Sequence, residues 1–149
     1  MAVNATKRYI YPAFWDETYE DNQHGHKRYK VILTGVADGT SDETNVHKVY
    51  LEAFKTTDGT PAGYFRIDSI ECISNVGFTL TTVQIDRDPI EIVAAFGDYT
   101  NMRVDFTENG KYAGFHDTGT GGTGDIMVST TGGSVNDSYT IAIEFRPKP

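Results

Sequence analysis

Short segments in which apolar and polar residues alternate recur along this chain of 149 residues, with turn residues between them. Residues 90–96, 102–106 and 139–145 alternate cleanly. Alternation with a period of two places successive side chains on opposite faces of a strand, whereas an amphipathic helix needs a period of 3.6. No segment shows a convincing period of 3.6. The pattern therefore predicts strands and no long helix.

The composition agrees with a β protein, because Tyr (9) and Phe (8) are frequent and aromatic residues favour strands. The length fits a single domain. About eight candidate strands, without a helix long enough for a βαβ crossover, predict an antiparallel β-sandwich of jelly-roll or immunoglobulin-like type. Pro12 restricts the N-terminal segment to an edge strand or an extended arm. We expect residues 1–26 to form that arm or edge strand and residues 27–149 to form the sandwich.

Local signals refine this prediction at three places. Phe65 and Ile67 share one parity of the strand pattern and Ile70 and Cys72 share the other, so the phase changes between them. Such a change predicts a β-bulge near residues 68–69. Residues 46–54 are expected to form one strand. An Asn-Gly pair at 109–110 predicts a hairpin turn, with a returning strand at 112–115.

A glycine-rich block, with Gly119, Gly121, Gly122 and Gly124 before Asp125, resembles a phosphate-binding loop. Such a loop needs a following helix and a Lys-Ser/Thr pair, and neither follows here. Asp125 would repel a phosphate. We expect an exposed, flexible loop between two strands, without a ligand.

Other candidates for chemistry are weak. Cys72 lies in an apolar strand, which favours a packing role over a catalytic thiol. His24 and His26 could share a zinc ion but lack a third ligand nearby, and Asp86 and Asp88 lack the ligand spacing of a calcium loop. A solvated loop and a turn are the simpler interpretations. No Gly-x-Ser-x-Gly motif occurs. We expect a protein that is not an enzyme and needs no cofactor or metal.

The net charge of −8 argues against direct binding of nucleic acid, which requires clustered Lys and Arg. No apolar run approaches the roughly 18 residues of a membrane span, and the N-terminus lacks the apolar stretch of a signal peptide. We therefore expect synthesis in a cytoplasm and no membrane partner.

Several phrases resemble small virion structural proteins of tailed bacteriophages, of the capsid decoration (cement) type. These phrases lie at residues 64–72, 77–80, 121–130 and 136–146, with a shorter one at 41–46. The resemblance implies a stoichiometric role on the capsid surface of a virion, with the major capsid protein as partner and no catalytic residues. Closed symmetry suggests a homo-oligomer, a trimer in preference to a dimer.

Aromatic residues and Arg anchor many protein interfaces. The expected capsid or inter-protomer contact therefore consists of N-terminal residues, namely Lys7, Arg8, Tyr9, Tyr11, Phe14 and Trp15. Three alternatives stay open: a head-to-tail connector or tail component, a carbohydrate-binding module with exposed aromatic residues such as Tyr64, Tyr99 or Tyr112, and a small glycosidase with two facing carboxylates.

Overall fold

The computed structural model describes residues 3–12, 28–106 and 122–149. These residues form nine strands and one short 3-10 helix, η1 (Leu51–Ala53). The strands are β1 (Val3–Tyr11), β2 (Tyr29–Ala37), β3 (Val46–Val49), β4 (Tyr64–Val76), β5 (Leu80–Ile85), β6 (Glu91–Gly97), β7 (Met102–Asp105), β8 (Ile126–Thr131) and β9 (Ser138–Lys148). No helix in these three segments is long and apolar enough to cross a membrane.

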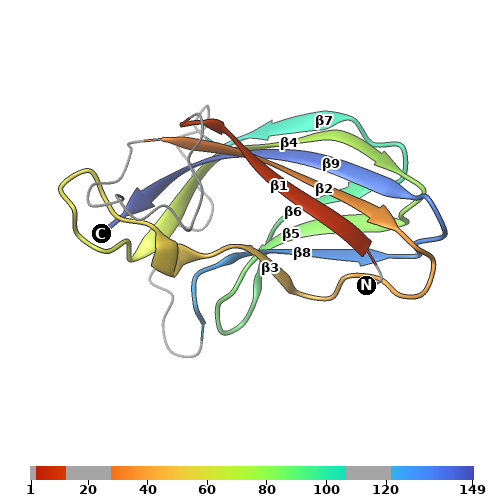
Figure 1. Cartoon of the computed structure of the whole chain (residues 1–149), viewed down its shortest axis with the longest axis horizontal. Coiled ribbons are helices and arrows are strands. Elements are labelled where there is room, and N and C mark those ends of the chain that lie inside the picture. The colour runs from red at the N-terminus through yellow and green to blue at the C-terminus, as the bar shows by residue number, and fades with distance from the viewer. Residues whose placement is uncertain (1–2, 13–27, 107–121) are drawn as a thin grey trace.

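The strands make two antiparallel sheets packed face to face (Figure 1). One sheet has the order β1-β2-β9-β4-β7 and the other the order β3-β8-β5-β6. The pairing is nested, since β2 pairs with β9, β3 with β8, β4 with β7 and β5 with β6. Nested pairing divided between two sheets is the arrangement of an eight-stranded jelly roll. The expected all-β sandwich is confirmed, and β1 adds a fifth strand to its first sheet.

The core lies between the sheets and is filled by the inward-facing residues of alternate positions. On β9, Ile141, Ile143 and Phe145 are fully buried, while the residues between them turn toward the other face. At one end of the sandwich the rings of Phe54 and Phe145 pack edge to face, with centroids 5.5 Å apart. Such apolar and aromatic packing is the main favourable contribution to folding.

The expected β-bulge is present in β4. Ile67 pairs with Phe145 and Ser69 pairs with Glu144, so that Asp68 has no partner in the register. The phase change in the sequence is therefore confirmed as a change in the strand itself.

The expected strand over residues 46–54 is wrong in its second half. β3 ends at Val49, and η1 follows. Leu51 and Phe54 are both buried and lie three residues apart, a spacing that one 3-10 turn places on the same side. The hairpin predicted at residues 109–115 lies outside the described residues.

Candidate functional site

β1 is the part of the expected contact surface that the structure describes most fully. Among the described strands it pairs only with β2, and five consecutive side chains, from Asn4 to Arg8, are exposed. It has nine residues, whereas the other edge strands β7, β3 and β6 have four, four and seven. A long edge strand offers unpaired backbone N–H and C=O groups to another chain.

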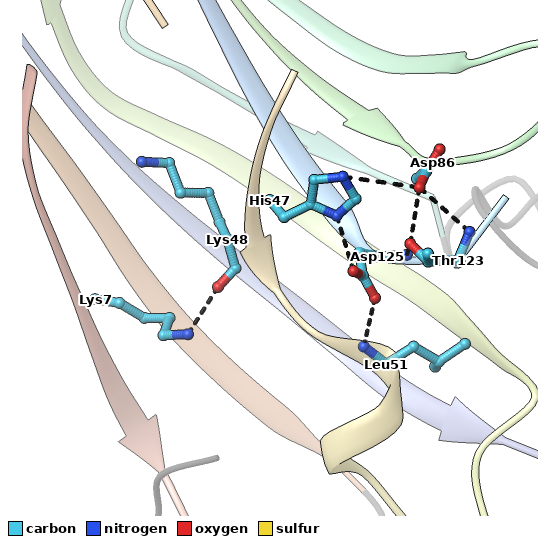
Figure 2. A network of polar contacts seen from close by, with 7 residues as sticks. All are labelled: Lys7, His47, Lys48, Leu51, Asp86, Thr123 and Asp125. Carbon is cyan, nitrogen blue, oxygen red and sulfur yellow. Dashed lines mark hydrogen bonds and ion pairs between the residues drawn. The ribbon is translucent and has the colours of Figure 1, made fainter. Parts of the chain in front are cut away.

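Lys7 extends from β1 across the open side of the sandwich (Figure 2). Its Nζ atom donates a hydrogen bond of 2.7 Å to the backbone carbonyl of Lys48 on β3. The ammonium group also lies 5.4 Å from the centroid of the Tyr50 ring, within reach of a cation–π interaction. Lys7 therefore has a structural role in the single chain as well as an exposed position.

The other sequence-predicted contact residues separate into different surroundings. Arg8 is exposed. Tyr9 lies in the core, where its ring centroid is 6.4 Å from that of Tyr29, so the structure removes it from the exposed surface. Tyr11 is half-buried, and its pKa rises to about 12 because of burial and of its hydrogen bond to Glu144. Phe14 and Trp15 lie outside the described residues. The contact itself stays a prediction.

A polar network joins β3 to the ends of β5 and β8 (Figure 2). The His47 Nδ1 atom lies 2.8 Å from the Asp125 Oδ2 atom, and Asp125 Oδ1 accepts the backbone N–H of Leu51 at 2.8 Å. A carboxylate can only accept, so His47 Nδ1 carries the proton of this hydrogen bond. Asp86 accepts from the Thr123 hydroxyl at 2.8 Å and stands 3.8 Å from His47 Nε2.

This network holds a histidine between two carboxylates. An Asp–His pair activates a nucleophile only when the second imidazole nitrogen reaches a hydroxyl or thiol. Here that nitrogen faces Asp86, and the Thr123 hydroxyl donates to Asp86. In the described ranges no group of three or more His, Cys, Asp or Glu could hold a metal ion. These side chains, namely His47, Asp86, Thr123 and Asp125, form a polar clamp that connects β3 to the ends of β5 and β8.

The glycine block takes part in this clamp, which corrects the expectation of an exposed, flexible loop for residues 122–125. Gly124 and Asp125 are buried, and the Gly124 N–H donates to the Asp86 carbonyl at 2.9 Å. A Cβ atom on Gly122 would lie 2.3 Å from the same carbonyl oxygen. Glycine is needed here because the loop packs against a neighbouring backbone. Gly119 and Gly121 lie outside the described residues.

The sequence did not predict the contact between His47 and Asp125, because the two residues are 78 positions apart and no motif links them. The other sequence candidates lie elsewhere. Cys72 is buried, which raises the pKa of its thiol to about 11 and agrees with a packing role. Asp86 contacts Thr123 across the loop. His24 and His26 lie outside the part of the chain that the structure describes.

Comparisons with known proteins give little that bears on function. No family model matches the chain, and no curated protein matches it. Among solved structures, the chain is similar to the cupin_2 domain of an XRE-family transcriptional regulator from Enterobacter cloacae, with 13% identity and a TM-score of 0.38 over 100% of both chains. At these values the likeness transfers no function from that regulator domain to this chain.

The comparisons contradict the resemblance to phage decoration proteins. The solved structure named above is a domain of a transcriptional regulator, and none of these comparisons supports a phage structural protein. The predicted function as a decoration protein is therefore wrong on these findings. The comparisons also give no support to the alternatives of a connector, a tail component or a carbohydrate-binding module. A capsid partner and a virion location depended on that resemblance alone and stay untested predictions.

Proposed function

We propose that the protein is a non-catalytic binding protein that assembles into a homo-oligomer through the exposed edge of β1. The observation that carries this proposal is the nine-residue edge strand with five consecutive exposed side chains. An edge of this length offers a row of backbone N–H and C=O groups for pairing with another chain. Among the residues that the structure describes, the His47 imidazole faces two carboxylates and no hydroxyl or thiol, which supports a role other than catalysis.

Charge favours a head-to-tail contact over a two-fold one. β1 carries Lys7 and Arg8 and no acidic side chain, whereas the whole chain has a net charge of −8. Pairing β1 with its own copy about a two-fold axis would bring these cations together. A contact between β1 and acidic side chains of the next copy would bring opposite charges together. Head-to-tail contacts close into rings when the rotation allows, and we propose a trimer.

Analytical ultracentrifugation of the full chain tests this proposal directly. We expect a species with about three times the chain mass of 16.5 kDa, and we expect it to dissociate as salt rises because exposed charges are screened. A monomer at about 100 µM protein in low salt would overturn the proposal, since stable interfaces have dissociation constants well below that concentration.

Two matched charge reversals locate the contact. Arg8→Glu reverses an exposed charge on β1 and should weaken self-association by about tenfold or more. Lys55→Glu makes the same charge change in the segment after η1 and should leave the mass distribution unchanged. Equal effects of the two variants would place the contact away from β1.

A further inference from the structure

A hollow of about 230 Å³ opens beside β4, β7 and β9 on the outer face of the five-stranded sheet. Its charged lining comes from Arg28, Asp68, Arg103, Asp105, Glu144 and Arg146. Three of these side chains are basic and three are acidic, so their formal charges balance. The hollow uses none of the exposed β1 residues 4–8 on which the proposed oligomer depends.

Asp68 is the extra residue of the β-bulge in β4 and follows Ile67, which faces the core. Its side chain therefore lies on the outer face of the sheet, where it reaches Arg146 on β9. The Arg146 Nε–H donates to Asp68 Oδ2 at 2.8 Å. Bulges are over-represented next to functional sites.

Asp68 has one oxygen that the fold leaves unsatisfied. Its side chain is only 6% exposed, and its Oδ1 atom has no hydrogen-bond partner among the described residues. A buried carboxylate oxygen without a donor lowers the stability of the folded chain. Native structures pair nearly all such atoms, so an unpaired one at the wall of a hollow indicates a missing donor.

The other two carboxylates of the hollow already have partners. Glu144 accepts a hydrogen bond from the Tyr11 hydroxyl and lies 3.8 Å from the Lys30 ammonium. Asp105 Oδ2 lies 3.5 Å from Arg103 Nη1. The missing donor is therefore needed at Asp68.

Two guanidinium groups stand at the rim of the same hollow. The side chains of Arg28 and Arg103 are 51% and 49% exposed. The Arg28 Nε atom is 4.0 Å from Asp68 Oδ2, beyond hydrogen-bond distance. Guanidinium groups bind carboxylates through two parallel N–H donors. The hollow thus combines a buried acceptor with exposed donors.

We propose that this hollow binds a small zwitterion, a molecule with one ammonium group and one carboxylate, of the size of a single amino acid. The ammonium donates to Asp68 Oδ1, and the carboxylate accepts from Arg28 and Arg103. A lone cation or anion would leave the hollow with an excess charge, whereas a zwitterion keeps it neutral. The volume of about 230 Å³ lies below the range of drug-sized ligand pockets, which favours a ligand of few atoms.

Titrations of the full-length ¹⁵N-labelled protein with defined probes test this proposal. Glycine, β-alanine and γ-aminobutyrate carry the two charged groups at increasing separation, and methylammonium and acetate carry one each. We expect at least one zwitterion to saturate the amide shifts of Ser69 and Arg146 below about 10 mM, with an affinity at least about tenfold above that of either single ion. Failure of all three zwitterions to saturate these shifts, or equal affinity for a single ion, overturns the proposal.

Three variants assign the binding to this hollow. Asp68→Asn should lower the affinity for the most tightly bound zwitterion by about tenfold or more. Arg103→Gln removes an exposed rim donor, so the chain should fold normally and bind the zwitterion several-fold more weakly. Glu52→Gln, an exposed change on η1, should leave the affinity unchanged. Wild-type affinity in Arg103→Gln overturns the proposal even if Asp68→Asn does not fold, and neither result affects the ultracentrifugation test of the oligomer.

Discussion

The Lys7 ammonium on β1 donates a hydrogen bond of 2.7 Å to the backbone carbonyl of Lys48 on β3. The two strands are edges of different sheets, so one side chain connects the sheets across the open side of the sandwich. The ring of Tyr50 lies 5.4 Å from the same ammonium group. An exposed cation on the proposed contact strand therefore also stabilises the single chain.

Lys7→Met should lower the free energy of unfolding by about 1 kcal/mol, because it removes this hydrogen bond and the cation–π contact. Urea unfolding at low protein concentration measures the effect without a contribution from self-association. Arg8→Met, at the next exposed position, should change stability by less than about 0.5 kcal/mol. Similar losses in both variants would mean that the contact to Lys48 adds no stability.

Asn75 is fully buried, and both ends of its side-chain amide make hydrogen bonds. Its Nδ2 atom lies 2.8 to 3.3 Å from the carbonyl oxygens of Phe78, Phe96 and Gly97, and its Oδ1 accepts from the Thr81 hydroxyl. Asn75→Asp replaces the donor with a negative charge beside three carbonyl dipoles. We expect a loss of about 3–5 kcal/mol in urea unfolding, as for an uncompensated buried charge.

Asn75→Ala is the comparison for that variant. It removes the same hydrogen bonds but introduces no charge, so it should destabilise the protein less than Asn75→Asp does. Equal stability of the two variants would show that a negative charge beside the three carbonyl groups adds no cost of its own.

Gly122→Ala should destabilise the protein, because the new Cβ atom would lie 2.3 Å from the carbonyl oxygen of Asp86 and 2.6 Å from the Cα atom of Arg87. Both neighbours are backbone atoms that cannot rotate away, and we expect a loss of about 1–3 kcal/mol. Gly97→Ala is the matched control, since its nearest contact is the Thr100 hydroxyl at 3.7 Å. Thermal unfolding of both variants checks the difference, which should vanish if the loop at Gly122 moves freely.

Tyr139 should make stability depend on alkaline pH. Burial and the neighbouring Glu43 carboxylate, which accepts its hydroxyl hydrogen bond at 2.6 Å, raise the pKa of Tyr139 well above the ordinary value of 10.0. Above pH 10 the unfolded chain releases this proton and the folded chain keeps it. The stabilisation is therefore complete below pH 10 and is lost as pH rises further, with a slope of up to about 1.4 kcal/mol per pH unit.

Urea unfolding between pH 8.5 and about 11.5 checks this dependence. Tyr139→Phe should be less stable near pH 8.5, because Glu43 loses a donor, and should show a shallower alkaline slope. The raised pKa values of Tyr11 and Cys72 act in the same direction and remain in both proteins. Tyr99→Phe, at a residue 78% exposed, should keep the wild-type slope. An unchanged slope in Tyr139→Phe would refute the linkage.

Local patterns in the sequence were sufficient to predict the elements that depend only on neighbouring residues. The alternation in residues 90–96 corresponds to β6, and the phase change after Ile67 corresponds to the bulge at Asp68. Both signals rest on the period of two along a strand, although in β6 only Ala94 and Phe96 of the alternating residues are buried and Ile92 is 62% exposed. The same reasoning failed over residues 50–54, because the sequence pattern alone does not show that Leu51 and Phe54 reach the core from a 3-10 turn.

The candidate sites were harder to predict, because their partners are far apart in the sequence. Lys7 and Arg8 were recognised as candidate contact residues, whereas the burial of Tyr9 against Tyr29 became visible only in the packed sandwich. The hollow around Asp68 depends on Arg146, which is 78 residues away. No spacing rule links these positions.

The sequence by itself determined that the chain is an all-β sandwich and where most of its strands and its bulge lie, since periodicity and turn chemistry act over a few residues. Only the tertiary structure decided the nested strand order, the clamp between His47 and Asp125, and the unpaired oxygen of Asp68. These features depend on which strands pair and in which register, and that choice is made by the burial of the whole core rather than by any one segment.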